Sequence, residues 1–457
     1  MSRGLAPLLA AVTLAVGSYG RAEAASAGPA AVAPPVVIVV FDALRADHLG
    51  LYGYRARPTS PTFDRLAGES IVLDDARAAA PYTLASVATL LTGRPPDEHT
   101  LTTFERALPR DVPTLPHALA SSGYRSLVAS RSGILHGFAL EDSFELELVD
   151  PQLTEDPRAF RSRWKEGIGT LAAGPQPWFA YLHFFPPHAP YRPPKAFTVP
   201  FVLPNVEGVS GSIAFLRALD SGATKLGAAA LDALVARYDA NIRYADHELA
   251  DLLDHLGKLG VLERAWLVVT SDHGEAFGEH GRFEHNSTVY EEMVKVPLLV
   301  RPPGGAQRAT RIGEPVGLVD LAPTVLAWAG QPVPAEMAGR PLPLAPGARY
   351  AARPRPITLR SASPPVRFGI TDGDWKYVRP LDDSAASSIA SEELYDLAAD
   401  PRERTNLAGT RGDVLARFRE SAAQELARQR AHAAAPRTLE AMPSETGDAL
   451  RALGYVQ

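Results

Sequence analysis

Two apolar runs in this chain each end in side chains that commonly bind metal ions. Residues 36–41 are followed by Asp42, and residues 266–271 are followed by the pair Asp272 and His273. Short runs rich in β-branched residues are typical of buried parallel strands. Because ligands gather beyond the carboxyl ends of such strands, we expect the two carboxylates and the imidazole to meet at one divalent cation. Taken alone, the second motif is more typical of a turn.

A threonine at the start of a helical segment is the candidate nucleophile. Residues 81–93 have the pattern of a loop that leads into a helix, and Thr83 stands where its hydroxyl would cap that helix. The N-terminus of a helix also attracts anions, and a nearby cation would lower the pKa of the hydroxyl enough for nucleophilic attack. A plain helix cap is the alternative, and it is the better interpretation of a threonine on its own.

The elements that must position these residues alternate between strand and helix. Further strands are predicted at 124–130, 178–184 and 296–301, and a helix at 115–122. Apolar residues spaced by three and four over 231–256 predict a long amphipathic helix that ends near Gly257 and Gly260. The alternation predicts an α/β fold, a doubly wound, mixed and mainly parallel sheet sandwiched by helices.

The C-terminal part is predicted to form a smaller α+β subdomain. Residues 346–366 are rich in Pro, Arg and Ser and are interpreted as a connector. A strand at 375–378, a polar loop at 382–391 and a helix at 413–431 follow. We therefore expect an α/β catalytic domain over 36–345, and a connector with the C-terminal subdomain over 346–457.

The N-terminus has the pattern of a secretory signal peptide. Arg3 precedes an apolar stretch at 5–16 that is too short to span a bilayer, and Ala22-Glu23-Ala24 resembles a cleavage site. Residues 1–24 are therefore predicted to be removed, and 25–35 to form an extended leader. The expected location is periplasmic or secreted, with no stable membrane span after cleavage. A retained membrane anchor is the alternative.

The composition excludes several classes of function. The chain has 457 residues, 46% of them hydrophobic, which suits a large folded core. Its formal net charge of −6 argues against a nucleic-acid partner, because binding to phosphates needs a positive surface. The sequence contains no cysteine, so disulfides, thiolate nucleophiles and thiolate metal sites are excluded.

Several motifs follow one another along the chain. They are Phe41-Asp42-Ala43-Leu44-Arg45-Ala46-Asp47-His48, the run 83–93, Pro187-His188-Ala189-Pro190-Tyr191, Ser271-Asp272-His273-Gly274-Glu275, the run 316–323, Glu393-Leu394-Tyr395-Asp396-Leu397, Asp400-Pro401 and Asn406-Leu407. In these motifs and their order the chain resembles the sulfatase branch of the alkaline-phosphatase superfamily, and the resemblance covers nearly the whole mature chain. It implies an α/β sandwich with a small C-terminal sheet, and one divalent cation that holds the oxygens of an ester.

The resemblance also implies roles for individual residues. The implied metal ligands are Asp42, Asp272, His273 and Thr83. Thr83 is also implied as the nucleophile, and His188 as the group that contacts the ester or protonates its leaving oxygen. His285 lies where the family places a substrate contact, and Arg131 falls near its usual substrate-binding pair. Alternatively, His188 is a rigid surface turn between prolines, and His285 binds only a loop carbonyl.

The chain departs from the family at its nucleophile. Typical sulfatases have Cys or Ser at the position of Thr83 and convert it to formylglycine. The methyl group on the threonine Cβ prevents that aldehyde, so no formylglycine is expected. Val87 replaces an arginine that supports the nucleophile, Ala43 replaces a second aspartate, and His273 replaces an asparagine. The resulting Asp/Asp/His/Thr set resembles the phosphoryl-transfer relatives more closely than the formylglycine sulfatases.

These observations predict a metal-dependent hydrolase of small anionic esters, sulfate or phosphate, in which Thr83 attacks in line and forms a covalent intermediate. Family habit favours Ca²⁺, whereas an imidazole ligand makes Mn²⁺ or Zn²⁺ plausible. Sulfate esters should turn over more slowly, because a threonine sulfate lacks the elimination route open to an aldehyde hydrate. Two alternatives remain: transfer of a phospho-group to an acceptor, and non-catalytic binding on the same fold.

Overall fold

The structure, a computed structural model, describes residues 1, 33–150, 155–198, 201, 206, 208–306, 310–344, 355–381 and 392–453. Residues 2–24 of the predicted signal peptide, 25–32 of the predicted leader and the polar loop predicted at 382–391 lie outside this set. No helix in the described part of the chain has the length and apolar character that a membrane crossing requires.

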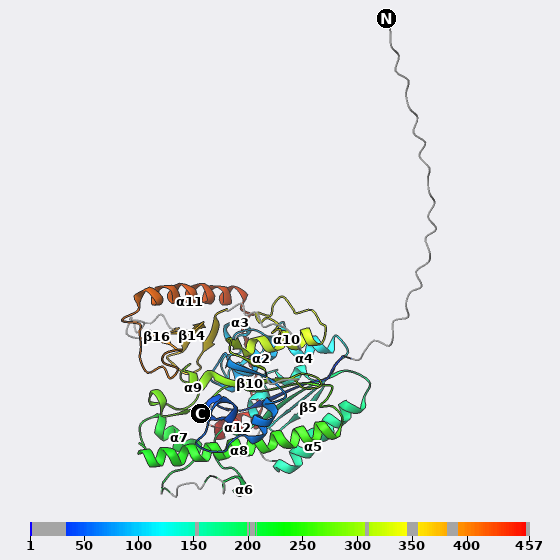
Figure 1. The fold of residues 1–457 in the computed structure, drawn as a ribbon, viewed down its shortest axis with the longest axis horizontal. Coiled ribbons are helices and arrows are strands. Elements are labelled where there is room, and N and C mark those ends of the chain that lie inside the picture. Colours follow the sequence, from blue (N-terminus) through cyan, green and yellow to red (C-terminus); the bar gives the residue numbers. More distant parts are fainter. Residues whose placement is uncertain are drawn as a thin grey trace. The chain divides into compact units, whose positions relative to one another are not determined.

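A mixed, mainly parallel sheet forms the centre of the fold (Figure 1). Its strands lie in the order β11 (Thr310–Ile312), β2 (Ile71–Arg77), β10 (Lys295–Arg301), β7 (Trp266–Ser271), β1 (Val36–Phe41), β6 (Trp178–Phe184), β4 (Arg125–Ser130) and β5 (Leu146–Val149), with β12 (Val316–Gly317) beside β2. Neighbouring strands are parallel, except that β10 runs antiparallel to β7 and β2. The predicted sheet is therefore confirmed, and the three further strands predicted in it fall within one residue of the observed bounds.

Strand β1 shows why a continuous apolar run forms the middle of such a sheet. All six of its residues are buried, because helices cover both faces. Val36, Ile38 and Val40 pack into one core, whereas Val37 and Val39 pack into the other. No position along the strand faces water, so the alternation of polar and apolar residues seen in half-exposed strands is absent.

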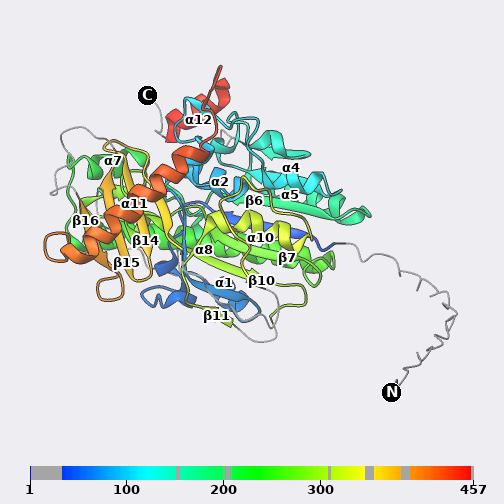
Figure 2. The ribbon, with the colours of Figure 1, turned by 90° about the horizontal axis from the view of Figure 1, so that it is seen from above.

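Helices lie on both faces of the sheet (Figures 1 and 2). One face is covered by α1 (Pro61–Ala67), α5 (Pro157–Ala173) and α8 (Ala228–Lys258), and the other by α2 (Thr83–Thr92), α4 (Leu115–Ala120) and α10 (Leu321–Trp328). Helix α8 confirms the predicted long helix, although Gly257 lies inside it. Gly260 makes the turn beyond its end with a φ of +64°, a conformation that glycine adopts without strain.

The predicted C-terminal α+β subdomain is confirmed. A four-stranded antiparallel sheet contains β13 (Ile357–Arg360), β14 (Arg367–Asp372), β15 (Trp375–Pro380) and β16 (Glu393–Asp396), and α11 (Gly412–His432) lies across it (Figure 2). The interpretation of 346–366 as a connector is wrong for β13. Ile357 and Leu359 alternate toward a buried cluster that includes Val289 and Met293 of the large domain, so this strand is part of the core.

Shorter elements complete the described chain. They are α3 (Pro96–His99), β3 (Arg106–Ala107), α6 (Lys195–Thr198), α7 (Ile213–Asp220), β8 (Ala276–Phe277), β9 (Phe283–Glu284), α9 (Glu291–Val294), β17 (Arg437–Thr438) and α12 (Ser444–Leu453). After α11 the chain returns to the large domain, where β17 pairs with β3. The hairpin of β8 and β9 follows β7, and it carries the chain from Asp272 toward His285.

Candidate active site

The carboxyl ends of β1, β6 and β7 meet at one edge of the large sheet. Phe41, the last residue of β1, is level with Phe184 on β6 and with Ser271 on β7. Asp42 and Asp272 are the next residues along their strands, so the register alone brings the two carboxylates together. This convergence was expected from the sequence, and the structure shows it.

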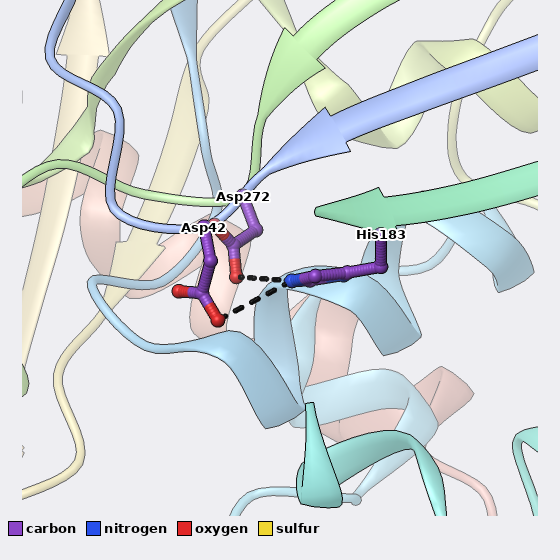
Figure 3. Close-up of side chains that lie close together, drawn as sticks. All are labelled: Asp42, His183 and Asp272. Carbon is purple, nitrogen blue, oxygen red and sulfur yellow. Dashed lines mark ion pairs between the residues drawn. The ribbon is translucent and has the colours of Figure 1, made fainter. Parts of the chain in front are cut away.

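A histidine from the strand between them completes the group. His183 is the penultimate residue of β6, and its imidazole points toward both carboxylates (Figure 3). Its Nε2 lies 3.3 Å from Asp42 Oδ2 and 4.0 Å from Asp272 Oδ2. All three side chains are buried, and among the described residues they form a group with the spacing of metal ligands.

Backbone contacts hold the Asp272 carboxylate in this orientation. Its Oδ1 accepts the N–H groups of His273 at 3.0 Å and Ala43 at 3.3 Å. Ala43 has a φ of +59°, and the Tyr238 hydroxyl of α8 stabilises this turn by donating to its carbonyl at 2.7 Å. The Oδ1 atom of Asp272 is therefore occupied by backbone hydrogen bonds, whereas its Oδ2 atom faces the site without a hydrogen-bond partner.

Thr83 lies in the same cluster, but it does not cap its helix. The residue at the N-cap of α2 is Tyr82, and Thr83 is the first helical residue. Its Oγ1 lies 3.2 Å from His273 Nε2 and 3.5 Å from Asp42 Oδ1, and the side chain is fully buried. The expectation of a cap is wrong, because the hydroxyl faces the site instead of the backbone N–H groups of its own helix.

The tautomer of His273 follows from its second contact. Its Nδ1 lies 2.8 Å from the carbonyl oxygen of Gly274, which can only accept, so Nδ1 carries the hydrogen. In the neutral ring, Nε2 then has a lone pair that faces the cluster, at 3.5 Å from Asp42 Oδ1 and 3.6 Å from Asp272 Oδ2. The four residues predicted as metal ligands thus lie together.

Two further histidines stand beside this cluster. The His188 ring lies 5.0 Å from the His285 ring, which lies 4.4 Å from the His273 ring. His188 is buried, so its interpretation as a surface turn is wrong. The Nδ1 of His285 lies 3.1 Å from Glu275 Oε1, and Glu275 Oε2 accepts the Tyr191 hydroxyl at 2.9 Å. Glu275 therefore orients His285 from behind.

The histidines change the ionisation of the cluster. Burial opposes a charge on Asp42, but the neighbouring imidazoles of His188, His183 and His273 outweigh it and hold the pKa of Asp42 well below its usual range. Burial likewise opposes a charge on His183, yet the two carboxylates raise its pKa. Burial lowers the pKa of His188, and the nearby His285 acts in the same direction.

Arg131 lies on the wall of a cavity that reaches the site. The cavity has a volume of about 350 Å³, and His183 and His188 are among its lining residues. Arg131 donates from Nε to Asp150 at 3.1 Å and from Nη2 to the carbonyl of Glu155 at 2.7 Å. The aromatic side chains along this cavity are Phe160, Trp164, Phe184, Phe185 and Tyr244.

His183 is not among the site residues predicted from the sequence, although the sequence contains a signal for it. The run 178–184 is otherwise apolar or aromatic, and this pattern alone predicts a strand without a functional side chain. A histidine one residue before the carboxyl end of a buried strand is unusual, because an imidazole in that place needs a partner. The sequence does not say that β6 lies directly beside β1, and this adjacency gives His183 its carboxylates.

Comparison with known proteins places the chain in a family. Residues 34–331 match the Sulfatase family model, and residues 278–431 match the model of the C-terminal region of N-sulphoglucosamine sulphohydrolase. The chain therefore belongs to the sulfatase family. N-acetylglucosamine-6-O-sulfatase from Bacteroides thetaiotaomicron is 32% identical over 193 residues, which are 38% of this chain and 31% of that protein. The chain thus matches about a third of the length of this relative.

Two solved structures share the fold. A protein in complex with its substrate D-glucosamine-2-N,6-O-disulfate has a TM-score of 0.72 at 21% identity, over 88% of this chain and 98% of that one. Phosphonate monoester hydrolase of Agrobacterium radiobacter has a TM-score of 0.67 at 20% identity, over 89% of this chain and 97% of its own. The similarity to both extends through the large sheet and the C-terminal subdomain.

Proposed function

We propose that this protein hydrolyses sulfate or phosphate esters with Thr83 as its nucleophile. One observation carries the proposal: a fully buried threonine hydroxyl, turned away from its own helix, lies within 3.5 Å of Asp42 and His273. A hydroxyl placed only for stability would cap the helix or bond to a carbonyl. Its position beside ionisable groups at the carboxyl edge of the sheet favours a catalytic role.

Asp42, Asp272, His273 and Thr83 would hold a divalent cation, and their surroundings fit one. The two carboxylates are buried side by side, and Asp272 Oδ2 has no hydrogen-bond partner. Buried charges of the same sign are costly unless a positive charge lies between them. When bound, the cation would favour the ionised form of the Thr83 hydroxyl and withdraw electron density from the ester.

The residues of the chain supply the remaining chemistry. The Thr83 oxygen attacks sulfur or phosphorus, and the bond to the leaving oxygen breaks as the new bond forms. His188 donates a proton from Nε2 to the leaving oxygen, since its Nδ1 is held 2.6 Å from the Ala189 carbonyl. Burial lowers the pKa of His188, and an anionic ester beside the ring would oppose this effect. Water then cleaves the threonine ester, and His188 takes up the proton released.

Two relatives support ester chemistry on this fold. By their names, one acts on a sulfate ester of N-acetylglucosamine and the other on phosphonate monoesters. Because Thr83 forms an ordinary ester that only water can cleave, we expect phosphate esters to turn over faster than sulfate esters. The aromatic walls of the cavity beside His188 favour an aryl or similarly flat group on the leaving oxygen.

A panel of aryl phosphate, aryl sulfate and phosphonate monoester substrates tests the proposal. We expect the wild type to hydrolyse at least one class, with Thr83→Ala slower by about 10³-fold or more, as expected for removal of a nucleophile. Thr83→Ser keeps the hydroxyl and should retain measurable turnover. Equal thermal stability of the variants controls for folding. Wild-type rates no higher than those of Thr83→Ala on every substrate would refute the proposal.

A further inference from the structure

We propose that His183 is a ligand of the divalent cation, and that it makes the site prefer a first-row transition metal such as Zn²⁺ over Ca²⁺. The inference rests on the metal site of the proposed function, but not on the ester chemistry. It adds to that site a residue from a third strand, β6.

Two buried atoms face each other without hydrogen-bond partners. His183 Nε2 and Asp272 Oδ2 are 4.0 Å apart, and neither atom has one. Asp42 Oδ2 lies 3.3 Å from the same nitrogen without making a directed hydrogen bond to it. Leaving one such buried atom unsatisfied costs about 1–3 kcal/mol. A cation between a lone pair and two carboxylates would satisfy all three groups at once.

The other ring nitrogen of His183 also has a hydrogen-bond partner. The Tyr181 hydroxyl, two residues earlier on β6, lies 3.1 Å from His183 Nδ1. With hydrogen on Nδ1, this nitrogen donates to the tyrosine oxygen, and Nε2 presents its lone pair to Asp42 and Asp272. Tyr181 is itself fully buried within the sheet, so the ring has little freedom to turn away.

Nitrogen ligands favour some cations over others. Ca²⁺ binds through six to eight oxygen ligands, whereas imidazole suits zinc and other transition metals. In this site the two carboxylates are flanked by the Nε2 atoms of His183 and His273, each within 4.0 Å of both. Because imidazole nitrogens lie beside the two carboxylates, we expect the site to bind Zn²⁺ more tightly than Ca²⁺.

The competing interpretation is that His183 is a protonated counter-charge to Asp42. The two interpretations predict opposite changes in metal affinity when His183 is removed. A positively charged His183 would repel a cation, so its removal would strengthen metal binding or leave it unchanged. A ligand His183 contributes a bond, so its removal weakens binding.

Metal titrations of the full chain decide between them. Metal-stripped wild type, His183→Ala, His183→Gln and the exposed control His247→Ala are titrated calorimetrically with Zn²⁺ and with Ca²⁺. We expect the wild type to bind Zn²⁺ at least tenfold more tightly than Ca²⁺. Removing a residue that hydrogen-bonds to a metal ligand costs about 10–100-fold in metal affinity. Removing the ligand itself should cost at least as much, so we expect both His183 variants to bind Zn²⁺ at least about 10–100-fold more weakly than the wild type. His247→Ala should match the wild type.

A spectroscopic readout does not depend on activity. Co²⁺ bound to the wild type should give visible absorption bands that shift in His183→Gln and not in His247→Ala. Unchanged or stronger Zn²⁺ binding in the His183 variants would overturn the proposal. A wild type that prefers Ca²⁺ or binds neither ion would also overturn the proposal. This test uses the wild-type protein alone, so it does not depend on whether the variants fold.

The same experiments separate this inference from the proposed function. If the wild type hydrolyses esters while His183→Ala keeps its Zn²⁺ affinity, only the role of His183 fails. If His183 proves to be a ligand but no ester in the panel is cleaved, the proposed function fails and the metal site stands.

Discussion

Two clusters of buried charged side chains differ in the kind of side chain that pairs with their carboxylates. At the junction with the small sheet, Lys376 of β15 lies 3.0 Å from Glu291 and 2.9 Å from Glu403, and Arg77 of β2 lies 2.8 Å from both Glu291 and Asp75. Cations and carboxylates alternate there. At the carboxyl edge of β1, β6 and β7, the two carboxylates face imidazoles, and no lysine or arginine among the described residues pairs with them.

The difference separates a cluster that serves the fold from one that, on our proposal, binds a cation. In the junction cluster, each of the three carboxylates has a lysine or arginine nitrogen within 3.0 Å, so the cluster can stabilise the packing of the two sheets without a bound ion. In the cluster at the sheet edge, the described groups that face the carboxylates are imidazoles, and the geometry is maintained by the backbone contacts of Asp272 and the turn at Ala43. Substitutions in the two clusters should therefore affect different properties.

The largest effect is expected from Asp272→Asn. The amide keeps an oxygen for the backbone N–H groups but removes the carboxylate charge from the site. Removing a residue that hydrogen-bonds to a metal ligand costs about 10–100-fold in metal affinity or activity. Removing the proposed ligand Asp272 itself should therefore reduce the rate of ester hydrolysis by more than about 100-fold. The free energy of unfolding of the metal-free protein should not fall, because the variant removes one of two neighbouring buried charges. Steady-state kinetics and urea unfolding measure both effects.

The junction should respond in the opposite way. Lys376→Met leaves Glu291 and Glu403 buried without their shared cation, and we expect a loss of about 3–5 kcal/mol in the free energy of unfolding. Turnover per folded molecule should stay close to that of the wild type. The exposed pair of Lys258 and Asp254 provides the control, and Lys258→Met should leave the free energy of unfolding close to that of the wild type. A Lys376 variant as stable as the wild type would contradict this assignment.

Metal addition should stabilise only through the sheet-edge cluster. At a free Zn²⁺ concentration of about 100 times the dissociation constant, linkage predicts about 2.7 kcal/mol of added stability for the stripped wild type. Asp272→Asn should show little of this gain, whereas Lys376→Met should show all of it. Thermal melts with and without metal measure the three responses, and an equal gain in all three proteins would place the cation elsewhere.

A smaller, pH-dependent effect is expected beside the junction. Burial alone would lower the pKa of His280, but its contacts with Glu292 and the Glu403 carbonyl raise it to about 9. Since this value lies above the unfolded value of 6.5, the stabilisation is complete below about pH 6.5 and is lost as the pH rises through 9. Because His280 is an exposed residue, water screens these contacts and the effect should stay below about 1 kcal/mol. His280→Asn should abolish this part of the pH dependence in urea titrations between pH 6 and 10.

Much of the architecture could be predicted because buried strands and helices have recognisable patterns of apolar residues. The runs at β1, β6 and β7 are continuous and apolar, and the period of α8 is regular over its whole length. Strand β13 was missed because its four residues stand among prolines and arginines, and only its pairing with β14 makes alternate positions buried.

The site was predictable where one chemical group follows directly after a strand. Asp42 and Asp272 have this position, so topology brings them together. Thr83 and His188 depended on family motifs, because nothing in the local sequence says which way their side chains face. His183 and the supporting contacts of Tyr238 and Glu275 depend on long-range packing, which the order of residues alone does not specify.

The central claim is that Thr83 forms the covalent bond to the substrate. Rapid acid quenching during single turnover of an aryl phosphate, followed by peptide mass spectrometry, tests it most directly. We expect one phosphoryl group on Thr83 of the peptide that contains residues 81–93, and none in Thr83→Ala. Product release with Thr83 unmodified at every quench time, or the label on a different side chain, would contradict the account.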